Sequence, residues 1–109
     1  MYVGTNRIRV QKGTGHQLEE RFSEQGGVEN HPGFIRFQMW KLDDDDEDFE
    51  EYLIVTQWKS KEHQREWVRS EGFRHAHSGP RADFILGHAR FRGYEVRLAS
   101  EIGQAKSPV

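Results

Sequence analysis

One tryptophan and one histidine, ten positions apart in the same predicted helical segment, are the residues of this sequence whose types and spacing could do chemistry. Trp67 lies inside the segment Lys61–His77, and His77 lies at its end. A break in the helix is expected near Ser70–Gly72, because glycine in a helix interior costs roughly 1 kcal/mol relative to alanine. A histidine at a loosened helix end, with an indole earlier in the segment, could face a flat apolar ligand.

Asn6 is the second unusual residue, because it stands in a stretch that alternates as a strand. The alternation places Asn6 on the same face as Ile8 and Val10, which should point into the core. A buried amide without a partner costs about 1–3 kcal/mol, so Asn6 needs a partner in the backbone, in water or in a ligand. From this residue alone, a backbone partner is the simpler interpretation.

The elements that must position these residues follow from hydrophobic periodicity and turn residues. Strands are predicted at residues 2–10, 34–42, 52–58 and 89–98, and residues 81–87 are expected to form a loop. The first helix starts after Thr14, which can cap it, carries Leu18 and Phe22 and ends at Gly26–Gly27. The second helix begins after Ser60.

The order strand, helix, strand, strand, helix, strand predicts an α+β fold, the ferredoxin-like βαββαβ arrangement with a four-stranded antiparallel sheet. A chain of 109 residues should form a single domain, here residues 1–99, and residues 100–109 lack apolar periodicity and are expected to form a flexible tail. Both faces of the strands at 34–42 and 52–58 carry large apolar groups, whereas the helices cover one face. A homodimer that pairs its sheets into an α+β barrel is therefore predicted.

Charge and composition narrow the functional classes. The net charge is −2, but the run DDDDEDFEE at residues 43–51 holds eight of the 18 acidic residues and is expected to be a solvated hairpin loop. The remaining chain is mildly basic, which suits an anionic ligand or merely a solvated surface. Scattered arginines and the acidic run argue against nucleic acid. No cysteine and no apolar run near 20 residues indicate a cytoplasmic protein without a membrane span.

Taken together, these pieces resemble the IsdG-type heme-degrading monooxygenases, a branch of the dimeric α+β barrel superfamily that includes the antibiotic-biosynthesis monooxygenases. The resemblance covers about residues 3–98 and depends on the joint order of several short motifs. These are Asn6, Glu20-Arg21-Phe22, Val28-Glu29 followed by Pro32-Gly33-Phe34, Trp58-Lys59-Ser60, and Trp67 with the ending Phe73-x-x-Ala76-His77.

The resemblance implies roles for individual residues. His77 would bind heme iron, although His75 competes with it; Trp67 would press on the porphyrin and hold it out of plane; and Asn6 would donate a hydrogen bond to oxygen or water on the iron. Arg21, Phe22 and Phe73 would contact the cofactor, with the Arg21 guanidinium meeting a propionate. The histidines outside this segment show no paired metal-ligand spacing and are expected at the surface: His16, His31, His63 and His88.

The implied reaction is oxidative opening of the porphyrin ring, with heme as both substrate and cofactor, O2 as oxidant and release of iron. Electrons would come from an external donor, a reductase or a chemical reductant, because the sequence has no flavin or nicotinamide fingerprint. Two alternatives stay open from the residues: a cofactor-free monooxygenase of the same superfamily acting on an aromatic small molecule, and a heme-binding or heme-buffering protein without turnover.

Overall fold

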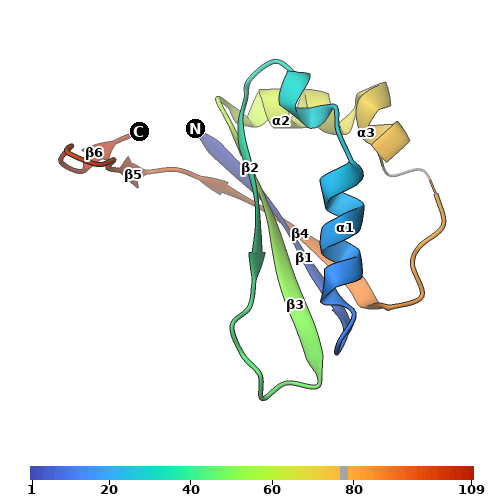
Figure 1. Cartoon of the computed structure of the whole chain (residues 1–109). Coiled ribbons are helices and arrows are strands. Elements are labelled where there is room, and N and C mark those ends of the chain that lie inside the picture. The colour runs from blue at the N-terminus through green and yellow to red at the C-terminus, as the bar shows by residue number, and fades with distance from the viewer. Residues whose placement is uncertain (77–78) are drawn as a thin grey trace.

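The chain forms a four-stranded sheet with helices on one face and a short hairpin at its C-terminal end (Figure 1). The computed structural model describes residues 1–76 and 79–109. In chain order the elements are β1 (Tyr2–Gln11), α1 (Gly15–Glu24), the 3-10 helix η1 (Val28–Asn30), β2 (Phe34–Lys41), β3 (Phe49–Trp58), α2 (Lys61–Val68), α3 (Glu71–Ala76), β4 (Ile85–Glu95), β5 (Leu98–Ala99) and β6 (Ser107–Pro108).

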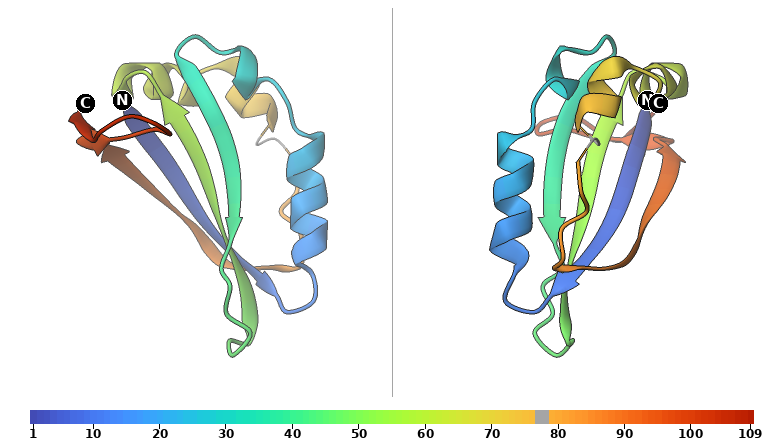
Figure 2. Two further views of the ribbon diagram at one scale, coloured as in Figure 1. Left: turned by 60° about the vertical axis from the view of Figure 1, so that its left-hand side comes forward. Right: turned by 90° about the vertical axis from the view of Figure 1, so that its right-hand side faces the viewer.

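The main sheet has the strand order β2-β3-β1-β4, and all of its neighbouring strands are antiparallel. The first strand therefore lies between β3 and β4, and each helical connection joins strands that are not neighbours. Figure 2 shows α1 along one face of the curved sheet, with α2 and α3 near one end of the strands. This confirms the predicted α+β, ferredoxin-like βαββαβ fold with a four-stranded antiparallel sheet.

The packed core lies between α1 and the middle of the sheet. Val10 and Ile8 of β1 are 0% and 8% exposed, and they form one cluster with Leu18 of α1 and with Tyr52 and Ile54 of β3. Alternation along the strands brings these side chains to the same face, because every second residue of a strand points to the same side. The core therefore fixes α1 against the two central strands.

The start of α1 is capped by a residue from a distant strand. Thr14 occupies the N-cap position, but its hydroxyl donates to the Gln11 carbonyl oxygen (2.5 Å) and makes no capping bond. A Glu50 carboxylate oxygen instead accepts from the backbone N–H groups of Gly15 (2.7 Å) and Gly13 (3.2 Å). The predicted Thr14 cap is wrong, because a carboxylate is the better acceptor at the positive end of a helix.

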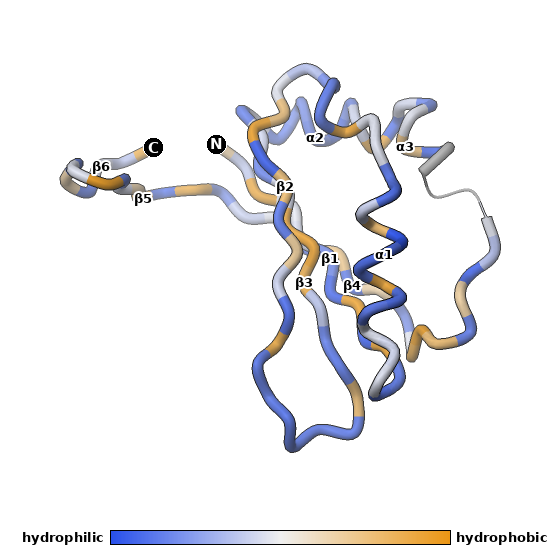
Figure 3. The backbone as a smooth tube through the Cα atoms, in the orientation of Figure 1, coloured by the Kyte–Doolittle hydropathy of each residue, from blue (hydrophilic) through white to orange (hydrophobic). Residues whose placement is uncertain are grey.

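The acidic run 43–51 is only partly a loop. Its first residues join β2 to β3 and form the strongly hydrophilic turn at the end of this hairpin (Figure 3). The last two acidic residues belong to β3, where Glu51 pairs with Arg9 (2.8 Å) and Glu50 pairs with Lys41 (2.9 Å). The prediction of a loop over the whole run is wrong, because cations on the neighbouring strands neutralise these two carboxylates.

The predicted break in the second helical segment is confirmed. Ser60 caps α2 by accepting from the His63 backbone N–H (3.2 Å), and α2 ends at Val68. Ser70 then stabilises both helix ends, since its hydroxyl donates to the Trp67 carbonyl oxygen (2.6 Å) and accepts from the Phe73 backbone N–H (3.1 Å). The two short helices therefore meet at a fixed joint next to Trp67.

The last part of the chain differs from the sequence expectation at its boundaries. β4 begins at Ile85, inside the segment expected to be a loop, and ends at Glu95. Residues of the expected tail turn back, so that Ser107 and Pro108 of β6 pair with β5. The hairpin projects from the sheet near the N-terminus (Figures 1 and 2). A single domain over residues 1–99 stays a prediction.

Within the described residues, no helix has the length and apolar character needed to span a membrane.

Candidate active site

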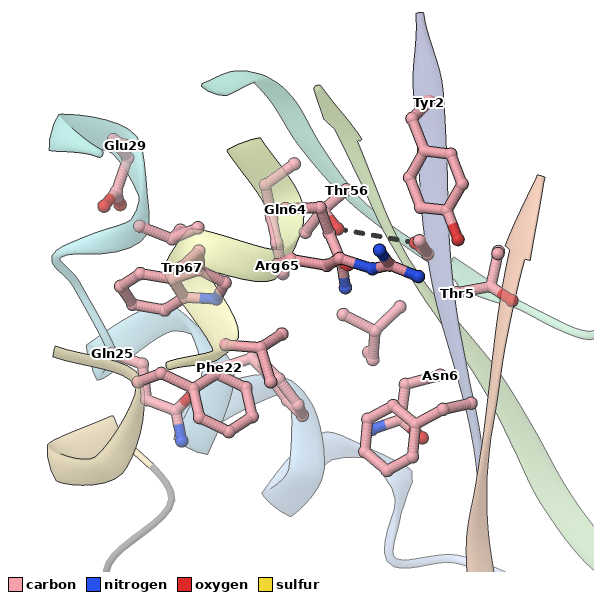
Figure 4. Close-up of a pocket in the computed structure, with 18 of the residues that line it drawn as sticks. Tyr2, Thr5, Asn6, Phe22, Gln25, Glu29, Thr56, Gln64, Arg65 and Trp67 are labelled. Atoms are coloured by element: carbon pink, nitrogen blue, oxygen red, sulfur yellow. Dashed lines mark hydrogen bonds between the residues drawn. The ribbon is translucent and has the colours of Figure 1, made fainter. Parts of the chain in front are cut away.

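A cavity of about 810 Å³ lies between the sheet and the helices, beyond the end of the packed core. Residues of β1, β3 and β4 border it from the sheet, and residues of α1, α2 and α3 border it from the helical layer. Figure 4 shows side chains of both layers directed into this space. Its volume falls within the range of roughly 300–1,000 Å³ that is usual for small-molecule sites.

Small residues in the strands keep this space open. Gly4 of β1 faces Thr56 of β3 and Gln64 of α2, and a Cβ atom at Gly4 would lie 3.3 Å from Thr56 Oγ1. On the other side of β1, Gly93 of β4 lies under the Tyr2 ring, where a Cβ atom would overlap the phenol hydroxyl. Side chains larger than glycine at either position would displace the residues that border the cavity.

Asn6 presents an unsatisfied polar atom beside this space. It lies in the sheet between Ile54 of β3 and Phe91 of β4, on the same face as the core residue Ile8. Within the described part of the chain, the buried Asn6 Oδ1 atom has no hydrogen-bond partner. An unpaired buried amide costs about 1–3 kcal/mol, so the position favours a polar group from water or a bound molecule. Among the described residues, the amide oxygen does not have the backbone partner expected from Asn6 alone.

Trp67 forms part of the opposite wall. Its side chain is 9% exposed, and Figure 4 shows the indole and the Asn6 amide on different sides of the space, carried by α2 and β1. The Phe73 ring meets the indole edge-on, with 5.8 Å between ring centroids and 88° between planes. Gly72 allows the close approach of α3, because a Cβ atom there would be 3.0 Å from the indole. A flat apolar surface therefore borders the cavity at a fixed place.

The structure brings together some of the residues singled out from the sequence and leaves others apart. Asn6, Phe22, Trp67 and Phe73 all border the cavity. Arg21 is exposed on α1 and is not among the described residues that border it, so its contact with a propionate stays a prediction. His77 lies outside the described residues, and its role as iron ligand also stays a prediction.

Several polar residues of the cavity were missed by the sequence analysis. Gln64 and Arg65 of α2 border the cavity, and Figure 4 shows the Arg65 guanidinium directed from α2 toward β1. Gln64 precedes Trp67 by one helical turn, so helical spacing could have found it. Arg65 had no such signal, because two helical positions separate it from Trp67 by roughly half a turn and only its long side chain reaches the cavity.

The clearest electrostatic effects belong to the packed end of the interlayer space. Burial raises the pKa of the Tyr52 phenol, and the Glu19 carboxylate that accepts its hydrogen bond (2.6 Å) reinforces this shift. The Lys41 ammonium lowers the pKa of Glu50, assisted by the backbone N–H of Gly15. In turn, the hydrogen bond from Lys41 to Glu50 raises the pKa of the lysine. These groups hold α1 and the strands together rather than facing the cavity.

Comparison with known proteins agrees with this arrangement. Residues 1–79 match the model of the antibiotic biosynthesis monooxygenase family, and the chain belongs to this family. The resemblance identified from the sequence is therefore confirmed. A heme-degrading monooxygenase from Bacillus thuringiensis (strain Al Hakam) is 35% identical over 100 residues, which cover 90% of this chain and 92% of the relative.

Solved structures extend the comparison to three dimensions. The heme degrader MhuD from Mycobacterium tuberculosis, with two hemes bound in its active site, matches with a TM-score of 0.71 and 35% identity, over 93% of this chain and all of MhuD. An MhuD mutant with two manganese protoporphyrin IX molecules per active site matches with a TM-score of 0.76 and 34% identity, over 93% of this chain and 99% of the mutant. These relatives share both the fold and a third of the sequence.

Proposed function

We propose that this protein is a heme-degrading monooxygenase. The observation that carries the proposal is the cavity between sheet and helices, which brings the unpaired amide oxygen of Asn6 and the indole of Trp67 to the same space. The 35% identity to a heme-degrading monooxygenase, over 90% of the chain, supports this assignment. The MhuD complexes support a porphyrin as the occupant.

The residues that border the cavity fit a flat apolar macrocycle with polar substituents. Phe22, Phe73 and Trp67 supply aromatic surface for the ring, and Ile54 supplies aliphatic surface from the sheet. The acceptor atom Asn6 Oδ1 is unpaired in the described structure, so a bound group that donates a hydrogen bond, such as a water molecule, would satisfy it. The guanidinium groups of the arginines that border the cavity, Arg65, Arg69 and Arg92, suit the carboxylates of a porphyrin.

The proposed iron ligand is the imidazole of His77, as the resemblance implies. The described helix α3 ends at Ala76, and its residue Phe73 borders the cavity, which supports a ligand in the residues that follow. A neutral imidazole nitrogen is the usual proximal ligand where a histidine holds heme. His75 is the competing candidate.

Heme bound here would be both substrate and cofactor: its iron supplies oxygen activation, O2 is the oxidant, and iron is released when the ring opens. The electrons come from outside the chain, from a reductase or a chemical reductant. The protein's own residues orient and shield the ring. The Trp67 indole would contact one face of the macrocycle and set its shape, and the Asn6 side-chain NH2 would donate a hydrogen bond into the space beside it.

The proposed assembly is a homodimer that pairs the uncovered sheet faces. Trp40 of β2 and Tyr94 of β4 are 52% and 48% exposed, and their pairing with Leu53 and Val3 places them on the face away from the helices. A second copy would cover these rings, because exposed apolar side chains on an uncovered sheet face are typical of a protein–protein interface. Sedimentation equilibrium tests this, because a monomer at micromolar concentration would contradict it.

The absence of cysteine suits a reducing compartment, and we place the enzyme in the cytoplasm.

A hemin titration followed by reductant in air tests the function. We expect a Soret band to appear with saturable stoichiometry and then to disappear on addition of ascorbate, with an iron chelator recording released iron. A protein that never develops the band fits the cofactor-free monooxygenase instead. A band that persists undiminished under reductant and air fits heme buffering without turnover.

The His77→Ala variant tests the iron ligand. We expect it to weaken hemin binding or abolish turnover, because the proposed bond between an imidazole nitrogen and the iron would be lost. The His88→Ala variant, which removes an exposed imidazole of β4, is the matched control and should behave as wild type. If His75→Ala rather than His77→Ala reduces binding, the ligand assignment moves to His75.

A further inference from the structure

Trp67 belongs to a continuous series of aromatic rings that begins in the sheet. Phe34 meets Trp58 with 5.7 Å between ring centroids, Trp58 meets His31 at 6.0 Å, and His31 meets Trp67 at 5.6 Å. Phe73 meets Trp67 from α3. All four contacts are edge-to-face, with interplanar angles between 69° and 88°. This is the favoured geometry of aromatic pairs, so each ring restricts the orientation of the next.

Trp58, in the middle of this series, is held by packing and by a hydrogen bond. Trp58 is fully buried, and its indole N–H donates to Thr56 Oγ1 at 3.0 Å. The Thr56 hydroxyl in turn donates to the Gly4 carbonyl oxygen (3.4 Å), across the ladder between β1 and β3. Trp58 is thus tied to the two central strands by packing and by a hydrogen bond. A ring resting against it has a rigid reference.

The backbone around His31 is equally constrained. Its N–H donates to the Val28 carbonyl oxygen (3.1 Å), which closes η1, and its carbonyl oxygen accepts from the Phe34 N–H (3.1 Å). Pro32 fixes one backbone angle directly after it, and Gly33 adopts a φ of 83° that favours glycine. The turn from η1 to β2 therefore carries the His31 ring to a defined place between the two indoles.

His31 is not among the described residues that border the cavity, whereas Trp67, which it contacts, does border it. The indole is confined by the His31 ring, by the Phe73 ring and by Gly72, where a Cβ atom would be 3.0 Å away. The sequence analysis placed His31 among the surface histidines, and this expectation is wrong, because the ring is half-buried against two tryptophans.

We propose that His31 is a positioning residue that fixes the plane of the Trp67 indole, and thereby the out-of-plane deformation of a porphyrin bound beside it. The proposal rests on the proposed function for its consequence, but not for the indole orientation itself. An aromatic pair of this geometry favours one ring orientation by roughly a factor of 2 to 12. Removing the ring of His31 should therefore release the indole without emptying the cavity.

The first experiment needs no porphyrin. The protein is labelled with 5-fluorotryptophan, and the Trp67→Phe variant assigns the Trp67 resonance in the fluorine NMR spectrum. In His31→Leu, which keeps bulk but removes the ring, we expect the Trp67 resonance to shift and broaden, while the resonance of Trp40, on the opposite face of the sheet, stays unchanged. His31→Phe should restore the wild-type resonance. His88→Ala is the control for loss of a histidine elsewhere, and His31→Gln replaces the leucine variant if that variant does not fold.

The second readout is the shape of the bound macrocycle. In hemin-loaded protein, resonance Raman lines of out-of-plane modes should weaken in His31→Leu and return in His31→Phe, with hemin affinity changed less than the line intensities. An unchanged Trp67 resonance in His31→Leu, or unchanged out-of-plane lines, would overturn the positioning role. If the wild-type protein binds no hemin, the proposed function fails, and the fluorine spectra still decide whether His31 orients the indole.

Discussion

The space between sheet and helices is filled at one end and hollow at the other, although the same strands form both ends. Along β1, Ile8 and Val10 are buried against α1, whereas Gly4 and Asn6 on the same face border the cavity. Where β1 carries aliphatic side chains the space is packed, and where it carries glycine and an amide the space is open for binding. The site is therefore made by small and polar residues inside a strand that is otherwise part of the core.

The two ends also use polar groups differently. At the filled end, the Glu50 carboxylate accepts bonds from two backbone N–H groups and from Lys41, and the Tyr52 hydroxyl donates to Glu19. At the hollow end, the Asn6 amide oxygen has no partner among the described residues. The filled end thus provides stability that allows an unpaired polar atom to be kept where a ligand can use it.

The largest effect is expected from opening the filled end. Leu18 is 2% exposed inside the core, so Leu18→Ala should lower the free energy of unfolding by about 2–5 kcal/mol through lost burial and a new cavity. Urea unfolding measures this change. Hemin affinity of the folded variant should stay near wild type, and an equal loss of affinity would show that the two ends are not independent.

Filling the hollow end is expected to raise the free energy of unfolding and to lower hemin affinity. Asn6→Leu removes the unpaired amide and adds apolar surface, so stability should rise by about 1 kcal/mol while hemin affinity falls at least about tenfold. Asn6→Ala is the matched variant, because it removes the amide without filling the space. It should bind hemin but degrade it slowly, and a wild-type rate would remove the proposed distal role of Asn6.

The charged cap of α1 predicts a pH-dependent difference at the filled end. The pKa of Glu50 is lowered from 4.5 by Lys41 and by backbone N–H groups, so its stabilising effect is present above pH 4.5 and is lost as the pH falls through the lowered pKa. Glu50→Gln should lower the free energy of unfolding by about 1–2 kcal/mol at pH 7. In urea unfolding at falling pH, the free energies of unfolding of wild type and Glu50→Gln should converge. The Glu47→Gln variant should not differ comparably from wild type at pH 7.

The smallest effect is expected at the rim of the hollow end. The exposed Arg65 guanidinium points into the cavity, where it can meet a porphyrin carboxylate, and exposed ion pairs contribute about 0.2–1 kcal/mol. Arg65→Gln should therefore weaken hemin binding by roughly 1.4- to 5-fold while leaving the affinity for hemin dimethyl ester unchanged. Arg74→Gln, on the exposed side of α3, is the control. Equal losses for both ligands would contradict carboxylate recognition.

Much of the fold could be predicted because its signals are local. Alternation in the strands, the apolar spacing of α1 and the break at Ser70–Gly72 each depend on neighbouring residues. The start of β3 could not, because Glu50 and Glu51 pair with β1 in the sheet while cations on other strands balance their charges. Of the candidate site, Asn6 and Trp67 were singled out by their positions in the sequence and given roles by the family resemblance, whereas the role of His31 needs contacts with two distant tryptophans.

The sequence by itself determined the order of strands and helices, the face of β1 that enters the core, and the anomaly of an amide on that face. Only the tertiary structure decided that this amide stays unpaired beside a cavity, that Glu50 caps a helix from another strand, and that His31 rests on Trp67. The physical reason is the distance along the chain between the residues that interact. Periodicity and capping residues act over one or two turns of chain, whereas a cavity and its ring contacts depend on segments that meet only after the sheet has formed.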